Sequence, residues 1–508
     1  MELFDLLVVG GGPGGYLCAE RAAQGGLKVA LFEKRALGGT CLNEGCIPTK
    51  TLLNSSKMYR HATESAAFGV TVTGVTYDHA KVIDRKNKVV KTLVSGVGAT
   101  MSANKVTVIT GDAKIAGRVE GGFAVEANGT TYNGRRLAIA SGSETVVPPV
   151  PGLKEGIASG FVVTNREVLD LKTLPKDLVV IGGGVIGLEM AYYFASVGVK
   201  VTVIEMMPKI AGATDPEICK VLQDSFVKRG MVFKLSSKVL EVKANSVIYE
   251  ENGEKKEIAC DKVLLSAGRK PSTANMGLET LGLEMDRAAI VTDRHLCTTV
   301  QNVYAIGDCN GKVMLAHTAY REAEVAVNHM LGKPDEMRYD VIPAVIYTDP
   351  EVASVGHSKE GAEKLGMKVK EVKLPMSYAG RYLAENEGGK GFIKLVVDTD
   401  RAYNDYKYKQ QYKDNFVTVS EFEKILDQLY QKGYVLVDFE SFVTETVAED
   451  GSVTFGTTPI YLPSGKTPIM LSQTMVNYMN YMLATDEADT DGGYGDGFAS
   501  KLVVRNGE

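Results

Sequence analysis

The pattern of apolar and polar positions along residues 4–33 predicts two strands joined by a helix. An apolar run at 4–9 has the length of a buried strand, and the glycine-rich turn 10–15 follows it directly. Residues 16–24 are helix-like, and the apolar run 28–33 predicts a second strand that ends in an acid. This order of elements is typical of a βαβ unit.

The same order of elements returns over residues 178–205. In both copies, 23 residues separate the first glycine of the turn from the acid that ends the second strand: Gly10 from Glu33, and Gly182 from Glu205. A single glycine-rich turn is a weak indicator, because an ordinary turn can carry it. Two copies in register predict sites for two dinucleotides, or for one dinucleotide and a close relative.

Each copy has the residues that a dinucleotide requires. The glycines let the backbone approach the pyrophosphate, whose charge lies at the N-terminus of a helix. Glu33 and Glu205 are placed to accept hydrogen bonds from a ribose. Because Met206 and Met207 follow Glu205 and no arginine is present there, the second site is expected to prefer NAD to NADP.

Two cysteines, Cys41 and Cys46, follow the first turn within the segment 39–48. Thiols held beside a bound dinucleotide can pass two electrons between sulfur and a ring cofactor. The alternative of a metal site is disfavoured, because four intervening residues are not a usual zinc spacing and no second ligand pair lies nearby. We therefore expect a redox pair and no metal.

Composition narrows the class of protein. A chain of 508 residues predicts two to four domains. A net charge of −5 argues against binding to nucleic acid or to a membrane surface. No apolar run reaches the roughly 18 residues that span a bilayer. Acids near the start and seven scattered cysteines predict a cytoplasmic protein rather than a secreted one.

Residues 39–52 resemble the redox-active segment of the flavoprotein disulfide reductases, the class I pyridine nucleotide-disulfide oxidoreductases. Leu42 and Ile47 make the segment most similar to that of dihydrolipoamide (dihydrolipoyl) dehydrogenases. The resemblance covers about residues 1–400. It continues through the segments 140–143, 267–271, 303–308, 314–318, 343–351 and 391–394.

The resemblance implies an α/β fold with two Rossmann-like dinucleotide-binding domains, one for FAD and one for NAD, followed by a truncated α+β interface domain and an atypical tail. The implied boundaries are 1–146 for the first part of the FAD domain, 147–270 for the NAD domain, 271–340 for the return to the FAD domain, 341–400 for the interface domain and 401–508 for the tail.

The resemblance also implies the site residues. Lys50 is expected to lie near the flavin N5 and to pair with Glu189, while Asp308 holds the ribitol or the pyrophosphate. The backbone of Lys114 is expected against the adenine. The other FAD positions are Gly10, Gly12, Gly15, Glu33, Met314, Leu315, Ala316 and His317, and Ser141, Gly142 and Ser143 are further cofactor-binding positions. The NAD positions are Gly182, Gly184, Gly187, Glu205, Val239 and Gly268, and Glu189 is counted among the cofactor-binding residues together with its partner Lys50.

The reaction implied is that of dihydrolipoyl dehydrogenase. Cys41 is expected to be the interchange thiol that the dithiol substrate attacks, and Cys46 the inner sulfur beside the flavin. Electrons from dihydrolipoamide would then reach NAD through FAD. The implied partners are a second copy of the chain and a lipoyl-bearing protein of a 2-oxo-acid dehydrogenase or glycine-cleavage system.

The chain departs from the family near residue 400. The family carries a His-Pro…Glu segment in its interface domain, whereas this chain has six histidines and none beyond His357. The dithiol reaction is therefore expected to be impaired, because the general base is missing. The alternative is a flavin-binding but catalytically incompetent fusion or misassembled product, with at most NADH diaphorase activity.

The tail, 401–508, has a different character. A helix is expected around 422–429, a strand at 434–438 and a turn between strands at 445–454. The segments 462–472 and 497–503 resemble a fragment of polysaccharide-deacetylase-like proteins, and the acidic run 486–491 is interpreted as a solvated loop. The tail is either an incomplete domain joined by fusion or misassembly, or an appended module that binds glycan or a partner; no catalysis is assigned to it.

Overall fold

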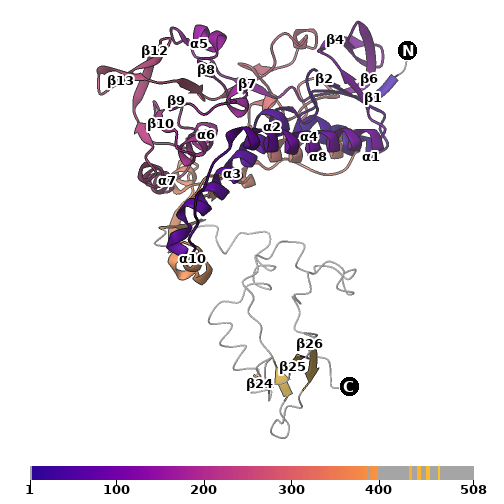
Figure 1. Ribbon diagram of the computed structural model, residues 1–508. Helices are drawn as coiled ribbons and strands as arrows, with labels where there is room; N and C mark the ends of the chain where they lie inside the picture. Colours follow the sequence, from indigo (N-terminus) through magenta and orange to yellow (C-terminus); the bar gives the residue numbers. More distant parts are fainter. Residues whose placement is uncertain are drawn as a thin grey trace. The chain divides into compact units, whose positions relative to one another are not determined.

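The computed structural model describes residues 3–386 and 390–398 and, in the tail, the backbone of four short strands (Figure 1). Contacts within the chain divide it into two units, Met1–Thr399 and Asp400–Glu508, each of which is described by itself. Among the described residues, none of the helices combines the length and the apolar character that a membrane crossing needs.

The first sheet of unit 1 is built around β1, Leu3–Val9, whose side chains alternate between two cores. Leu6 and Val8 pack on one face against the helices α1, α4 and α8, and Leu7 and Val9 pack on the other against β4 and β5. The strand order is β3-β2-β1-β6-β5-β4, and β19 also pairs with β6. The bounds are β2 Val29–Glu33, β3 Thr107–Thr110, β4 Ala113–Val119, β5 Gly122–Ala127, β6 Thr130–Ile139, β19 Val303–Ala305, α1 Pro13–Gln24, α4 His79–Ala103 and α8 Ala316–Met330.

The second sheet repeats this architecture around β9, Asp177–Ile181. Val180 packs against the helices α6 and α7, while Val179 and Ile181 pack against an antiparallel sheet made of β12, β13 and β14. All five strands are parallel, in the order β11-β10-β9-β15-β8. The bounds are β8 Val162–Val163, β10 Lys200–Ile204, β11 Val232–Lys234, β12 Ser237–Val242, β13 Ser246–Glu251, β14 Glu254–Ala259, β15 Lys262–Leu265, α6 Val185–Ser196 and α7 Pro216–Lys228.

The two sheets confirm the predicted α/β fold with two Rossmann-like units. The strands predicted at 4–9, 28–33, 178–181 and 200–205 all form, with ends that move by one residue. The first helix begins earlier than predicted, at Pro13. Proline fits the first turn of a helix, because the N–H groups there have no partner within the helix and the N–H that proline lacks is not needed. The elements between and after the sheets are α2 Gly39–Glu44, α3 Cys46–Glu64, α5 Leu153–Ser159, β7 Ser143–Thr145, β16 Arg269–Pro271, β17 Met285–Asp286 and β18 Ala289–Ile290.

The end of unit 1 has an unusual distribution of polar and apolar side chains. Strands β22, Val369–Pro375, and β23, Phe392–Asp398, pair antiparallel. On one face, Lys394 Nζ lies 3.0 Å from Asp215 Oδ2 at the start of α7. The opposite face is exposed and apolar, with Val372, Leu374, Ile393, Leu395 and Val397. The described residues therefore leave uncovered a surface that a globular chain normally buries. The neighbouring elements are β20 Ala344–Ile346, β21 Val352–Ser354, α9 Lys359–Lys364 and α10 Gly380–Glu385.

Four short strands are described in unit 2. β24, Tyr434–Leu436, pairs parallel with β27, Thr467–Ile469, and β25, Val443–Val447, pairs antiparallel with β26, Val453–Thr457. The predicted strand at 434–438 and the predicted turn between strands at 445–454 agree with these pairings. The helix expected at 422–429, the acidic loop and most of the deacetylase-like segments lie outside the described residues.

Candidate redox and dinucleotide site

The two cysteines of the predicted redox pair lie on consecutive helices. Cys41 belongs to α2, and Cys46 is the first residue of α3, with Gly45 between the helices. A Cβ atom added to Gly45 would stand 3.0 Å from the Thr40 carbonyl oxygen, so the short connection favours glycine. Both cysteines are free thiols and partly exposed. The pair therefore spans the junction of the two helices.

The two thiols differ in acidity. A hydrogen bond from Cys41 and the charge of Lys50 lower the pKa of Cys46 to about 7, although burial acts against them. The same hydrogen bond, together with burial, raises the pKa of Cys41. Placement at the start of α3 is a further feature that favours a thiolate. Of the two thiols, Cys46 is therefore the one that ionises first as the pH rises, while Cys41 keeps its proton.

The structure also pairs Lys50 with Glu189. Lys50 Nζ, on α3, lies 3.0 and 2.9 Å from the two carboxylate oxygens of Glu189 on α6. Glu189 is 3% exposed and also accepts a hydrogen bond of 3.0 Å from the Tyr347 N–H. The Tyr347 ring lies below the ammonium, 4.6 Å from Nζ to the ring centroid. A buried carboxylate is thus fully partnered, and a positive charge is held beside Cys46.

The first glycine turn has the backbone that its sequence predicted. Gly10 has φ +111°, and its N–H donates to the Phe32 carbonyl at 2.8 Å. A Cβ atom on Gly15 would stand 1.7 Å from the Gly10 carbonyl oxygen, so α1 and β1 can meet this closely only at glycine. Glu33 Oε2 accepts the Gly11 N–H at 2.8 Å. The acid and the turn are therefore locked together.

The second turn repeats these contacts one by one. Gly182 has φ +105°, and its N–H donates to the Ile204 carbonyl at 2.9 Å. A Cβ atom on Gly187 would stand 2.3 Å from the Gly182 carbonyl oxygen. Glu205 Oε2 accepts the Gly183 N–H at 2.5 Å. The internal repeat seen in the sequence is thus also a repeat of hydrogen bonds.

Both turns fit a dinucleotide. Gly12 and Gly184 are the cap residues that precede α1 and α6, and neither provides a capping side chain, so N–H groups in the first turn of each helix remain for an anion. Open space surrounds Gly184, and the nearest atom to a Cβ on Gly12 would be 3.8 Å away. Among the described residues, the buried hydroxyl of Ser141 has no hydrogen-bond partner. These features are those of a site shaped for a further polar group.

The remaining predicted residues gather around the first turn or lie along the strands. Asp308 accepts a hydrogen bond from the Ser143 hydroxyl, which accepts one of 2.7 Å from Arg269 Nε. Residues 314–317 lead into α8, and His317 Nε2 lies 2.7 Å from the Pro343 carbonyl oxygen. Gly142 and Gly268 have positive φ, Lys114 lies in β4, and Val239 lies in β12. Their roles toward a cofactor stay predictions.

Comparison with known proteins gives the family. The model of the pyridine nucleotide-disulphide oxidoreductases matches residues 4–323, and the model of the dimerisation domain of these proteins matches residues 342–402. The chain belongs to this family. Neither match extends past residue 402, so the deacetylase-like resemblance of the tail gains no support from them.

Relatives of this disulphide oxidoreductase include dihydrolipoyl dehydrogenases. The oxidoreductase is 45% identical over 329 residues to the dihydrolipoyl dehydrogenase of Acholeplasma laidlawii, a match that covers 65% of this chain and 96% of that protein. It is 39% identical over 406 residues to the mitochondrial dihydrolipoyl dehydrogenase of Pisum sativum, which covers 78% of this chain and 80% of that one. The enzyme is therefore a disulphide oxidoreductase of the dihydrolipoyl dehydrogenase type.

Solved structures agree on the fold of this oxidoreductase. The HOCl-induced flavoprotein disulfide reductase RclA from Escherichia coli matches with a TM-score of 0.68 at 28% identity, covering 78% of this chain and 88% of that one. LpdA from Mycobacterium tuberculosis matches with a TM-score of 0.70 at 24% identity, covering 77% and 87% of the two chains, which shows a common fold.

Two residues of the site escaped the sequence analysis. Tyr347 lies in the segment 343–351, which carried the resemblance but no role, and it binds both members of the Lys50–Glu189 pair. Asn165 gave no signal in the sequence, yet its side chain donates to the carbonyl of Glu44, next to the redox pair. Only the folded chain brings such distant positions together.

Substitutions at two glycines of the second turn should separate folding from binding. Gly184→Ala should fold normally, because its Cβ meets open space, but should weaken NADH binding about tenfold or more by occupying the place of the pyrophosphate. Gly182→Ala should lower stability by about 1–3 kcal/mol, because φ is +105°. NADH titration and thermal unfolding measure the two effects. NADH binding by Gly184→Ala at the original affinity would contradict this placement of the pyrophosphate.

Proposed function

We propose that the chain is a dihydrolipoyl dehydrogenase that oxidises protein-bound dihydrolipoamide to lipoamide. The observation that carries the proposal is the cysteine pair beside the Lys50–Glu189 ion pair, where the pKa of Cys46 is lowered to about 7 and that of Cys41 is raised. The same chain carries two glycine turns of the kind that binds dinucleotides, which would provide the electron acceptors.

The thiols carry the first part of the reaction. In the oxidised enzyme, a substrate thiolate attacks Cys41, and the bond between Cys41 and Cys46 breaks with its electron pair on Cys46. The second substrate thiolate then attacks the substrate sulfur of the mixed disulfide, closes the lipoamide disulfide and expels Cys41 as a thiolate. Cys41 takes up one of the two protons that the substrate thiols lost, and the other proton goes to solvent. The substrate has lost two electrons and two protons, and the enzyme holds both electrons on its sulfurs. Lys50 stabilises the charge that collects on Cys46.

The two turns have separate partners in this proposal. The first turn, with Glu33, would hold FAD, and the second, with Glu205, would hold NAD. Bound there, FAD would accept the electron pair from sulfur and pass it to NAD as hydride. A carboxylate at Glu205 disfavours the 2′-phosphate of NADP, and both Met206 and Met207 beside it are uncharged and exposed.

We also propose that the working enzyme is a homodimer that receives its substrate from a lipoyl-bearing protein. The dimerisation-domain match over 342–402 supports the dimer. So does the exposed apolar face of β22 and β23, because a second copy would remove that face from water. A lipoyl-bearing protein of a 2-oxo-acid dehydrogenase or glycine-cleavage system would present the dithiol, as the dehydrogenase relatives suggest.

We expect the dithiol half of the reaction to be slow. The sequence carries no histidine after His357, so it lacks the base that the family resemblance places in the interface domain. A positioned base contributes about 10²–10⁴ in rate. Oxidation of NADH does not depend on that base, so diaphorase activity should be retained. In the alternative proposal the chain binds flavin but does not turn over dithiol at all.

Spectroscopy of the purified protein tests both proposals. Bound FAD gives a flavin spectrum, and added dihydrolipoamide should produce a long-wavelength band from the Cys46 thiolate beside the ring, followed by reduction of added NAD. A flavin spectrum without the band or the NAD reduction would favour the incompetent fusion. Absence of bound flavin would contradict both proposals.

A further inference from the structure

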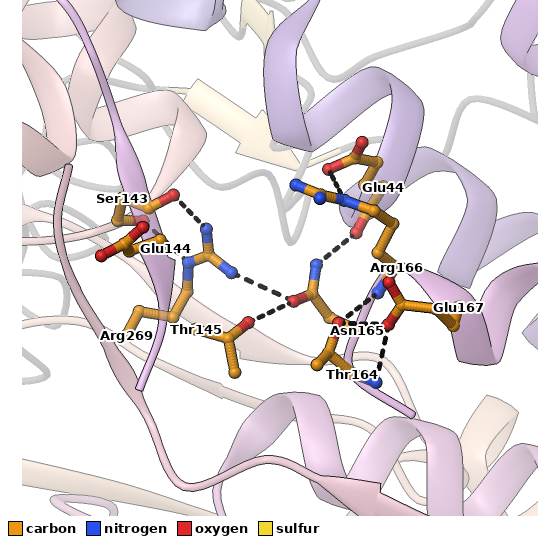
Figure 2. A pocket seen from close by; sticks show the side chains of 9 residues that line it. All are labelled: Glu44, Ser143, Glu144, Thr145, Thr164, Asn165, Arg166, Glu167 and Arg269. Atoms are coloured by element: carbon orange, nitrogen blue, oxygen red, sulfur yellow. Dashed lines mark hydrogen bonds and ion pairs between the residues drawn. The ribbon is translucent and has the colours of Figure 1, made fainter. Parts of the chain in front are cut away.

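A polar cavity of about 210 Å³ adjoins the helix that carries Cys41 (Figure 2). Its walls come from α2, from the paired strands β7 and β16, and from residues 164–167. The cavity is lined by Glu44, Ser143, Glu144, Thr145, Thr164, Asn165, Arg166, Glu167 and Arg269. Figure 2 shows Asn165 at its centre, between Glu44 on one side and Thr145 with Arg269 on the other.

The Asn165 amide uses both of its ends. Its Nδ2 donates to the Glu44 carbonyl oxygen at 2.8 Å. Its Oδ1 accepts from Thr145 Oγ1 at 2.7 Å and from Arg269 Nη1 at 3.4 Å. Glu44 is the last residue of α2, where carbonyl groups lack a partner within the helix. The amide therefore ties the end of α2 to the β7–β16 pair.

The Glu44 side chain is held from the same segment. Its carboxylate lies 2.8 Å from Arg166 Nε and 2.8 Å from an Arg35 guanidinium nitrogen, and it is 17% exposed. Arg166 directly follows Asn165 in the chain. Two adjacent residues, Asn165 and Arg166, thus hold the carbonyl and the carboxylate of Glu44, which lies one residue before Gly45 and two before Cys46.

We propose that Asn165 is a positioning residue for the redox pair: by holding the Glu44 carbonyl, it fixes the Glu44–Gly45–Cys46 backbone and so the distance between the sulfurs of Cys41 and Cys46. The proposal rests on the proposed function, because it assigns these sulfurs their redox role. Asn165 touches neither sulfur, and it acts through the backbone that joins the two helices.

The pKa of Cys46 is sensitive to the distance between the two sulfurs. The lowered pKa of Cys46 depends first on the hydrogen bond from Cys41, and that bond forms only while the two sulfurs stay close together. The other charged or titratable groups that act on the pair come from four elements: Lys50 on α3, Glu189 on α6, Tyr16 on α1 and Arg269 on β16. A substitution at Asn165 changes none of these side chains, but Asn165→Leu also removes the 3.4 Å hydrogen bond that Arg269 Nη1 donates, whereas Asn165→Asp keeps that acceptor.

Alkylation of the reduced protein by iodoacetamide at a series of pH values tests the proposal. Mass spectrometry of the peptides with Cys41 and Cys46 gives the midpoint at which the pair ionises. Asn165→Leu removes all of the amide hydrogen bonds, and Asn165→Asp keeps the acceptor for Thr145 and Arg269 but loses the donor to Glu44. Both variants should raise the midpoint by about one pH unit.

The controls separate the carbonyl contact from other effects. Thr145→Val removes one bond to Asn165 and should leave the midpoint unchanged. Asn104→Leu, which loses a similar 2.9 Å bond to the Thr100 carbonyl at the end of α4, should also leave it unchanged. Asn165→Asp introduces a negative charge and Asn165→Leu does not. Equal shifts of the midpoint in the two variants therefore exclude this charge as the cause of the shift.

Three outcomes would overturn the proposal. One is a midpoint in Asn165→Leu and Asn165→Asp equal to that of the original protein. Another is a shift of the alkylation midpoint in Asn104→Leu that is as large as the shift in the two Asn165 variants. The third is loss of the folded circular-dichroism spectrum in both Asn165 variants, because the side chain would then be needed for folding and not specifically for the geometry of the redox pair. Alkylation requires neither flavin nor lipoamide, so failure of the proposed function would leave this test interpretable.

Discussion

Cys46→Ser is expected to reduce dihydrolipoamide-dependent NAD reduction at least about 10³-fold. A serine hydroxyl neither forms the disulfide nor ionises near neutral pH, whereas the Cys46 thiol has a pKa lowered to about 7. The long-wavelength band of the reduced enzyme should disappear with the sulfur. In the original protein the band should grow as the pH rises through about 7, because the thiolate is the form that predominates above its pKa. Absorbance and NADH formation measure both effects.

Two matched variants control this result. Cys41→Ser should also abolish dithiol turnover but should keep the band, since Cys46 remains and the serine hydroxyl can still donate a hydrogen bond to its thiolate. Cys297→Ser replaces another partly exposed cysteine and should change neither quantity. A band that survives in Cys46→Ser would show that the roles of the two sulfurs have been assigned the wrong way round.

Added imidazole is expected to increase the rate of dihydrolipoamide oxidation by the unmodified enzyme. The upper limit of the increase is the rate factor of roughly 10²–10⁴ that a positioned base contributes. The reason is the lack of any histidine after His357. Without a base, the rate should rise with pH up to the ionisation of the substrate thiol itself, at a pKa of about 8.5 or above. Steady-state rates at constant ionic strength, with and without imidazole, measure the effect.

The NADH-dependent reaction is the internal control for this experiment. Reduction of an artificial electron acceptor by NADH needs no dithiol, so imidazole should leave its rate unchanged. A dithiol reaction that is fast without imidazole and levels off near pH 6.5 would contradict the expectation. Such a profile would place a base elsewhere in the assembled enzyme.

The sequence predicted those features that depend on local patterns. Both βαβ units, the acids at the ends of their second strands and the paired Cys41 and Cys46 followed from runs, turns and spacings. The pairing of Lys50 with Glu189 came from the family resemblance, because 139 residues separate the two. Nothing in the local pattern at either position indicates the other.

Features that depend on packing between distant segments could not be predicted. The hairpin of β22 and β23 alternates in a way that suggests an apolar core face, yet its polar side faces α7, because Asp215, Glu217 and Glu371 surround Lys394. The contact of Asn165 with Glu44 joins residues 121 positions apart. Such contacts are decided by the arrangement of the sheets, which a single sequence does not contain.

The ion pair between Lys50 and Glu189 makes the two nucleotide-binding halves unsuited to exchange as independent modules. Lys50 belongs to α3, the helix that carries Cys46, whereas Glu189 belongs to α6, the helix that follows the second glycine turn. A chimaera that took residues 147–270 from a donor without this acid would leave an ammonium group unpaired next to the thiols. Engineering of coenzyme preference in this protein should therefore graft the loop after Glu205 and keep α6 in place.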